Sequence, residues 1–184
     1  MRKFLALIFA GALTLGTSGL AFATDVPLDN ARLEQRLSGE VRHELAMIPQ
    51  VTVFDNLAYK VQGSTVTLYG EVRNAVISDV AEKSVKRLEG VERVDNKIEV
   101  LPASFNDDRI RMQVARAVFG DNRLFYYGNE PVPPIRIVVK NGHVDLVGVV
   151  RTQTDKDTAF IRANGVPGVF SVENNLQVEL PSKG

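Results

Sequence analysis

Two histidines are the side chains of this chain best suited to metal binding or acid–base catalysis. His43 and His143 are the only imidazoles, and cysteine is absent. A zinc site needs a second ligand a few residues from the first, and neither histidine has one. We therefore expect no metal site and no cofactor, and we predict that both histidines lie on exposed surfaces.

Neighbouring carboxylates are the other candidates for catalysis. Asp107 and Asp108 directly precede the apolar Ile110, which is the place of N-cap and first-turn acids that stabilise the start of a helix. Asp155 and Asp157 also begin a helical pattern. The lack of cysteine excludes thiolate nucleophiles and disulfides, and no phosphate-binding loop is present. The sequence predicts that the protein is not an enzyme.

The first 23 residues have the pattern of a secretory signal peptide. Arg2 and Lys3 precede an apolar run, and Ala21 and Ala23 provide the small residues of a cleavage site. A membrane anchor is the alternative, but glycines and hydroxyl residues interrupt the run and no basic cluster follows. We expect an exported chain in the periplasm. Because a bacterial lipoprotein needs a modifiable cysteine, we also expect that it is not a lipoprotein.

The remainder of the chain is a tandem repeat of one sequence unit. Residues 59–100 align without a gap with 137–178, and thirteen of the 42 positions are identical. Upstream, three apolar residues of each copy also align in pairs, namely Leu33, Leu37 and Val41 with Ile110, Val114 and Val118. The duplication predicts two homologous domains, 29–102 and 106–181, joined by a short linker.

Each copy has the pattern helix, strand, strand, helix, strand. Apolar residues recur every four positions from Leu33 to Leu45, as in a helix, and Asn141-Gly142 is a strong signal for a two-residue hairpin turn. The helix between the second and third strands requires a parallel crossover, whereas the hairpin is antiparallel. The predicted fold class is α+β, with two repeated αββαβ modules, each a three-stranded mixed sheet covered on one face by two helices.

Four glycines occupy matching positions in the two copies. Gly70 and Gly148 lie inside predicted strands, where glycine marks a bulge or a close backbone approach. Approach of a ligand is the alternative for this pair. Gly90 and Gly168 follow the second helix of each copy, and we predict that Gly90 ends that helix at the C′ position. We expect all four to be structural.

The segments 139–150 and 168–178 combine glycine, valine and asparagine at a spacing that resembles the BON domain family. The first copy has the same skeleton in 66–72 and 90–100, but it lacks Asn-Gly at the turn. A signal peptide followed by two such domains is similar to the osmotically inducible periplasmic proteins of the OsmY type. The resemblance implies a non-enzymatic role in the Gram-negative envelope, through phospholipid binding, stress protection or chaperoning.

The predicted helix at 109–119 has an apolar stripe on its outer side. On a helical wheel, Met112 and Phe119 lie opposite the sheet-facing residues. The same face of the first copy carries Arg36, Gly39, Arg42 and His43. Aromatic rings beside arginines suit an anionic lipid surface. We therefore predict a lipid-binding surface that consists of Arg109, Met112, Arg116, Phe119, Arg123 and Phe125.

Two functions and one structural alternative remain open at this point. The surface binds either an anionic phospholipid membrane or, in a chaperone, unfolded envelope and outer-membrane protein clients. Alternatively, Phe119 and Phe125 pack under a loop or on the other copy, and the arginines are merely solvated. The 22 basic and 22 acidic residues balance, which predicts no nucleic-acid partner. The sequence predicts neither an oligomeric state nor the relative orientation of the copies.

Overall fold

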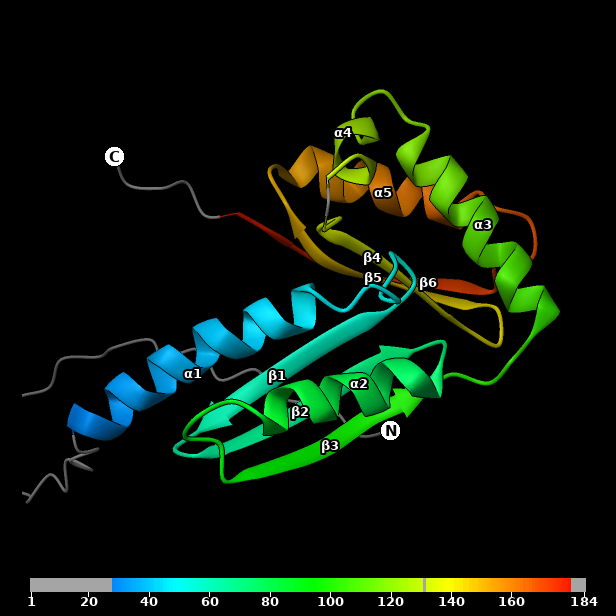
Figure 1. Cartoon of the computed structure of the whole chain (residues 1–184). Coiled ribbons are helices and arrows are strands. Elements are labelled where there is room, and N and C mark those ends of the chain that lie inside the picture. The colour runs from blue at the N-terminus through cyan, green and yellow to red at the C-terminus, as the bar shows by residue number, and fades with distance from the viewer. Residues whose placement is uncertain (1–27, 131, 180–184) are drawn as a thin grey trace, which may run out of the picture.

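The computed structural model describes residues 28–130 and 132–179, and it has two modules (Figure 1). The predicted signal peptide lies outside the described residues. The first module consists of α1 (Leu28–Ala46), β1 (Asn56–Gln62), β2 (Thr65–Val72), α2 (Ala75–Lys86) and β3 (Arg93–Val100). The second consists of α3 (Phe105–Phe119), α4 (Phe125–Gly128), β4 (Ile135–Lys140), β5 (His143–Val150), α5 (Gln153–Asn164) and β6 (Ser171–Val178).

Each module has one three-stranded mixed sheet, with the strand order β1-β2-β3 or β4-β5-β6. The hairpin strands are antiparallel, and the crossover strands β2 and β3, like β5 and β6, are parallel. Two long helices cover one face of each sheet (Figure 1). The predicted fold class is therefore confirmed. The four-residue helix α4 is an addition that the repeat pattern did not predict.

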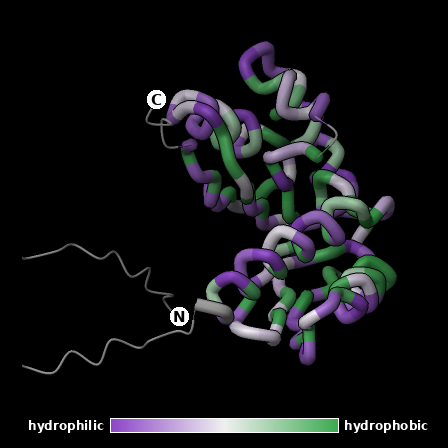
Figure 2. The backbone as a smooth tube through the Cα atoms, turned by 60° about the vertical axis from the view of Figure 1, so that its left-hand side comes forward, coloured by the Kyte–Doolittle hydropathy of each residue, from purple (hydrophilic) through white to green (hydrophobic). Residues whose placement is uncertain are grey.

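The two cores are built from equivalent positions. In the first, Val66 and Leu68 of β2 pack with Val41 of α1. In the second, Val144 and Leu146 of β5 pack with apolar residues of α3 and α5. The period of two along the strands and of 3.6 along the helices places apolar residues inward. Figure 2 shows hydrophobic and hydrophilic positions mixed along the chain in both modules. Among the described residues, no helix is both long and apolar enough to cross a membrane.

Two of the four glycines lie where a second strand approaches closely. A β-carbon on Gly148, which has a φ of 127°, would lie 1.8 Å from the carbonyl oxygen of Pro134. The equivalent distance from Gly70, with a φ of 111°, to the carbonyl oxygen of Asn56 is 2.1 Å. Only glycine has both the positive φ and the missing side chain that these positions require.

The other two glycines lie in the loops that lead to the last strand of each module. Helix α2 ends at Lys86 with Arg87 as its C-cap, so the prediction that Gly90 ends the helix is wrong. Gly90 instead lies against α1, where a β-carbon would be 3.1 Å from Leu33. Gly168 lies against α3 in the same way. Both loops pass close to the first helix of their module.

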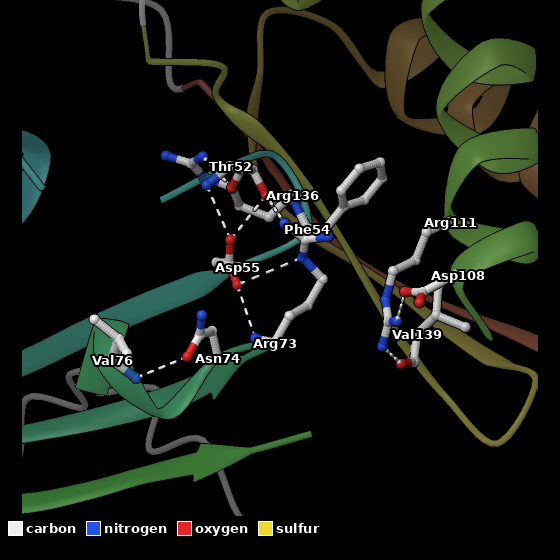
Figure 3. Close-up of polar contacts among 10 residues, drawn as sticks. All are labelled: Thr52, Phe54, Asp55, Arg73, Asn74, Val76, Asp108, Arg111, Arg136 and Val139. Atoms are coloured by element: carbon white, nitrogen blue, oxygen red, sulfur yellow. Dashed lines mark hydrogen bonds and ion pairs between the residues drawn. The ribbon is translucent and has the colours of Figure 1, made fainter. Parts of the chain in front are cut away.

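The modules contact each other through the segment before β1. The backbone N–H of Ile137 in β4 donates to the carbonyl oxygen of Val53, at 2.7 Å. One step along, the guanidinium of Arg136 donates to the carbonyl oxygen of Thr52, at 3.1 Å (Figure 3). Phe54 packs against the second core. A loop of the first module thus covers part of the edge of the second sheet.

Candidate functional site

Helix α3 carries a row of solvent-exposed residues on the side that faces away from the sheet. Ser104 is its N-cap, because the Ser104 hydroxyl accepts a hydrogen bond from the N–H of Asp107 at 3.2 Å. The helix therefore begins before the predicted segment, and Phe105 joins the outer face. The side chains of Phe105 and Met112 are 97% and 57% exposed. We call Phe105, Arg109, Met112 and Arg116, which lie on successive turns, the α3 stripe.

The opposite side of α3 is fixed by buried polar contacts. The buried carboxylate of Asp107 accepts hydrogen bonds from the N–H groups of Asn141 and Gly142, at 2.9 and 2.8 Å. The buried guanidinium of Arg111 donates to the carbonyl oxygen of Val139, at 2.7 Å. These bonds tie the first two turns of α3 to the β4–β5 hairpin. The α3 stripe is consequently held rigidly outward.

Among the described residues, Arg109 and Arg116 of the predicted surface have no carboxylate partner, whereas Arg123 lies near the carboxylate of Asp121 and lowers its pKa. Arg109 donates to the side-chain carbonyl of Asn106 at 2.8 Å. Within the described ranges, neither Arg109, Arg116 nor Arg123 forms an ion pair, whereas Arg111 pairs with Asp108. The charges of Arg109 and Arg116 are therefore available to an anionic partner.

The structure does not bring all six predicted residues together. Arg109, Met112 and Arg116 share one face of α3 with Phe105, whereas Arg123 and Phe125 lie beyond the C-terminal end of α3, and Phe125 is 61% exposed. Phe119 is only partly exposed and packs on the second core. A β-carbon on Gly128 would lie 3.0 Å from its ring. The prediction that Phe119 faces solvent is wrong, because α4 folds back over it.

Two exposed rings at the N-terminal end of α3 were not predicted. Phe105 lies just before the predicted second domain, 106–181, and Phe170, 74% exposed, lies in the loop before β6. The N–H of Phe170 donates to the carbonyl oxygen of Gly142 at 2.9 Å, so this loop adjoins the hairpin turn that Asp107 binds. The sequence alone could have indicated Phe170. The repeat alignment pairs this aromatic residue with the charged Glu92, so the position does not belong to the apolar pattern that the two copies share.

The structure gives the residues that were considered for catalysis either an exposed position or a structural role. Both histidines are exposed, as predicted, and the described part of the chain has no cluster of three metal-ligating side chains. Asp107 lies in the first turn of α3, but it is not the N-cap. Asp155 is buried and accepts a hydrogen bond from the hydroxyl of Tyr127, at 3.0 Å. Burial, reinforced by Asp155, raises the pKa of Tyr127, which therefore keeps its proton and serves as a tie.

Comparison with known proteins places these features in a family context. Residues 34–102 and 106–179 each match the BON domain. The outer membrane lipoprotein DolP of Haemophilus influenzae is 28% identical over 172 residues, which cover 91% of this chain and 83% of DolP. Osmotically-inducible protein Y of Escherichia coli is 27% identical over 131 residues, 67% of this chain and 62% of that protein.

Solved structures add little. The C-terminal domain of CdsD, a structural protein of the Type III secretion system of Chlamydia trachomatis, aligns with 78% of this chain and 98% of its own. The sequence identity is 14% and the TM-score 0.29, which is too low for any argument from this likeness.

The similarity to DolP contradicts the predicted localisation, a periplasmic protein that is not a lipoprotein. That prediction separated the chain from the lipoproteins because it contains no cysteine. A relative that matches 91% of the chain is nevertheless an outer membrane lipoprotein. The absence of cysteine therefore does not separate this chain from DolP, and the predicted localisation is wrong.

The resemblance that the glycine, valine and asparagine spacing indicated is confirmed by these matches. They cover most of both modules, and each module has the same strand order and the same antiparallel and parallel pairings. The chain belongs to the BON domain family.

Proposed function

We propose that the second module docks on an anionic phospholipid surface through the α3 stripe, and that the protein acts without catalysis in envelope maintenance under osmotic stress. One observation carries this proposal. Phe105 and Met112 are exposed on the same helix face as Arg109 and Arg116, which form no ion pairs within the described ranges. The names of the two relatives, an outer membrane lipoprotein and an osmotically inducible protein, support the setting.

The geometry of the α3 stripe suits a helix that lies in the plane of a membrane surface. Phe105 and Arg116 are about 16 Å apart along the helix axis, so the stripe contacts a surface over three turns. The apolar side chains enter the headgroup boundary while the guanidinium groups remain at the phosphates. Phe170, at the same end of the module, adds a further ring next to the stripe.

The expected affinity is modest. Transfer of an exposed ring such as Phe105 from water to an apolar environment is worth about 1.5–3 kcal/mol. Each arginine near an anionic surface adds about 1 kcal/mol, and this part weakens as salt screens the charges. Binding should therefore be reversible, selective for anionic lipid and salt-sensitive.

Co-sedimentation with vesicles tests the proposal. The protein is mixed with phosphatidylglycerol-containing or pure phosphatidylcholine vesicles at low and high salt, beside Phe105→Ser/Met112→Ser and Arg109→Gln/Arg116→Gln. The matched control is Arg32→Gln/Gln35→Ser on α1, where Arg32 and Gln35 align with Arg109 and Met112. We expect binding to the anionic vesicles alone, reduced about tenfold or more in both α3 variants and unchanged in the control. Unchanged binding by both α3 variants would contradict the proposal.

The exposed phenylalanines also favour a second candidate function, the capture of unfolded envelope proteins. Phe105, Phe125 and Phe170 offer apolar contacts without any requirement for charge. Capture of this kind should persist at high salt, whereas lipid attraction should not. Suppression of the aggregation of an unfolding outer-membrane protein, measured by light scattering, tests this candidate. Unaltered aggregation at equimolar protein would count against it.

A further inference from the structure

A cavity lies between the modules, on the side of the molecule where α1 ends. Its volume is about 210 Å³, and it is lined by α1, the following loop and β1 of the first module, and by residues 132, 133 and 136 of the second. The apolar part of the wall consists mainly of Leu45, Ile48, Val51 and Leu57. Three charged residues also line it, namely Arg42 and Asp55 of the first module and Arg136 of the second.

The contacts between the modules adjoin this cavity through Arg136, which lines it. The carbonyl oxygens of Thr52 and Val53 accept hydrogen bonds from Arg136 and from the N–H of Ile137, at 3.1 and 2.7 Å. Arg136 is thus anchored by one of its nitrogens (Figure 3). The cavity exists only while this arrangement of the modules persists.

The lining holds two arginines and one carboxylate, that of Asp55, so the cavity has a surplus of positive charge. Neither Arg42 nor Arg136 is in an ion pair within the described residues. Burial lowers the pKa of Arg136, and the nearby Asp55 offsets this only in part. The buried carboxylate of Asp55 already accepts hydrogen bonds from the N–H and hydroxyl of Thr52 and from the N–H of Arg73, at 2.8–2.9 Å. Asp55 also forms an ion pair at 3.9 Å with Arg73, which does not line the cavity, so its charge is shared with a third arginine.

We propose that this cavity binds a small amphiphilic anion. A single carboxylate or phosphate group lies between Arg42 and Arg136, and a short alkyl or aryl tail packs on the apolar wall. Guanidinium groups suit this task because their planar N–H groups match the oxygens of carboxylates and phosphates. The site is separate from the α3 stripe and adds a soluble ligand to the proposed function.

Size and charge define the class of ligand. The volume is below the range of about 300–1,000 Å³ that is typical of pockets for drug-sized molecules, so a whole phospholipid does not fit. A neutral molecule would leave the surplus positive charge of the lining without a partner, and a cation would be repelled by both arginines. Because the ligand touches both modules, it should stabilise their docked arrangement.

Isothermal titration calorimetry of the full chain with octanoate, octyl phosphate, 1-octanol and octylammonium tests the inference. We expect one molecule of octanoate or octyl phosphate to bind per chain, and the two head groups distinguish a carboxylate from a phosphate ligand. The alcohol and the ammonium compound should bind at least tenfold more weakly. Absence of binding by both anions, or equal binding by 1-octanol, would overturn the proposal.

The decisive variant is Arg42→Gln, because Arg42 is exposed and its removal leaves the contact between the modules intact. It should weaken anion binding about tenfold or more. The matched control is Arg32→Gln, an exposed arginine on the same helix that does not line the cavity. Anion binding that is unaffected by Arg42→Gln, or that is lost in the α3 variant Phe105→Ser, would place the ligand elsewhere and contradict the proposal. Failure of vesicle binding would leave this result untouched.

Discussion

Helices α1 and α3 occupy equivalent places in the two modules, and their inner faces agree, whereas their outer faces share Arg32 and Arg109 but differ further along. The aligned pairs Leu37 and Val114, and Val41 and Val118, are fully buried in their cores. At two later outer positions the aligned residues differ in kind, with Gln35 aligned with Met112 and Gly39 with Arg116. The fold requires apolar residues only on the inner faces. The outer difference therefore points to function, and it points to the second module.

The modules also reach the same local structure with different groups. In the first, the side chain of Glu34 accepts a hydrogen bond from the N–H of Gly63 at the hairpin turn. In the second, the turn is bound by the buried Asp107 through two N–H groups. The N–H of Arg73 donates directly to Asp55, whereas the N–H of Arg151 donates to the Tyr127 hydroxyl. The second module is thus more tightly tied at its hairpin turn, where two N–H groups rather than one are bound.

The largest effect is expected at the glycine that the modules share. Gly148→Ala should lower the free energy of unfolding by at least about 3 kcal/mol, because its β-carbon would clash with backbone at a positive φ. Gly70→Ala should have a similar effect. Gly39→Ala is the control, since it meets nothing within 4 Å and should stabilise α1 slightly. Urea unfolding measures all three, and a loss below about 1 kcal/mol at Gly148 would refute the account of this position.

The hairpin ties should differ in strength. Asp107→Ala leaves two backbone N–H groups at the turn without their acceptor, and it should cost about 2–4 kcal/mol of unfolding free energy. Glu34→Ala removes one less buried acceptor and should cost about 1 kcal/mol. Chemical denaturation measures both values. Equal losses would show that the second module is not the more tightly tied.

An exchange of outer residues should transfer lipid binding. Met112→Gln/Arg116→Gly gives α3 the residues of α1 and should reduce vesicle binding about tenfold. Gln35→Met/Gly39→Arg makes the reverse change on α1, where the space beside Gly39 is open. Binding by this second variant should exceed that of the unmodified chain. Vesicle flotation measures the binding of both variants. An exchange without effect in either direction would contradict the claim that the outer residues of α3 account for lipid binding.

The smallest effect concerns a carboxylate near the contact between the modules. Burial raises the pKa of Asp145, and Glu173 and Glu71 act in the same direction, whereas its counterpart in the first module is the uncharged Thr67. A raised pKa in the folded state makes the native protein more stable as pH falls through that value. Asp145→Asn keeps the acceptor for Asn175 and removes the charge.

Asp145→Asn should therefore raise the melting temperature at pH 7 by about 1–3 °C. The advantage should vanish as the pH approaches and passes below 3.8, the ordinary pKa of an aspartate. Thermal melts from pH 3 to 7 measure this difference. A benefit that does not depend on pH would rule out the charge as its cause.

The sequence predicted features that depend on local patterns. The duplicated strands and the turn at Asn141-Gly142 were predictable because alternation and turn chemistry act over a few residues. Phe105 was missed because Ser104, assigned to the linker, caps α3 one turn earlier than predicted. The error at Phe119 arose because α4, which has no counterpart in the first copy, covers it.

The cavity and the contact between the modules could not be predicted from local sequence patterns. The hydrogen bond between Val53 and Ile137 joins residues that no periodicity relates. Arg42 and Arg136 come together only because the modules dock in one orientation. Such features depend on tertiary packing, which a single sequence does not encode in its spacing.

One labelling experiment tests the central claim, that α3 rather than α1 contacts the lipid. The chain contains no cysteine, so Met112→Cys and Gln35→Cys each provide a single site for an environment-sensitive fluorophore. With phosphatidylglycerol vesicles at low salt, the label at position 112 should shift its emission to the blue, and the label at position 35 should not. Equal shifts at both positions, or no shift at position 112, would contradict the account.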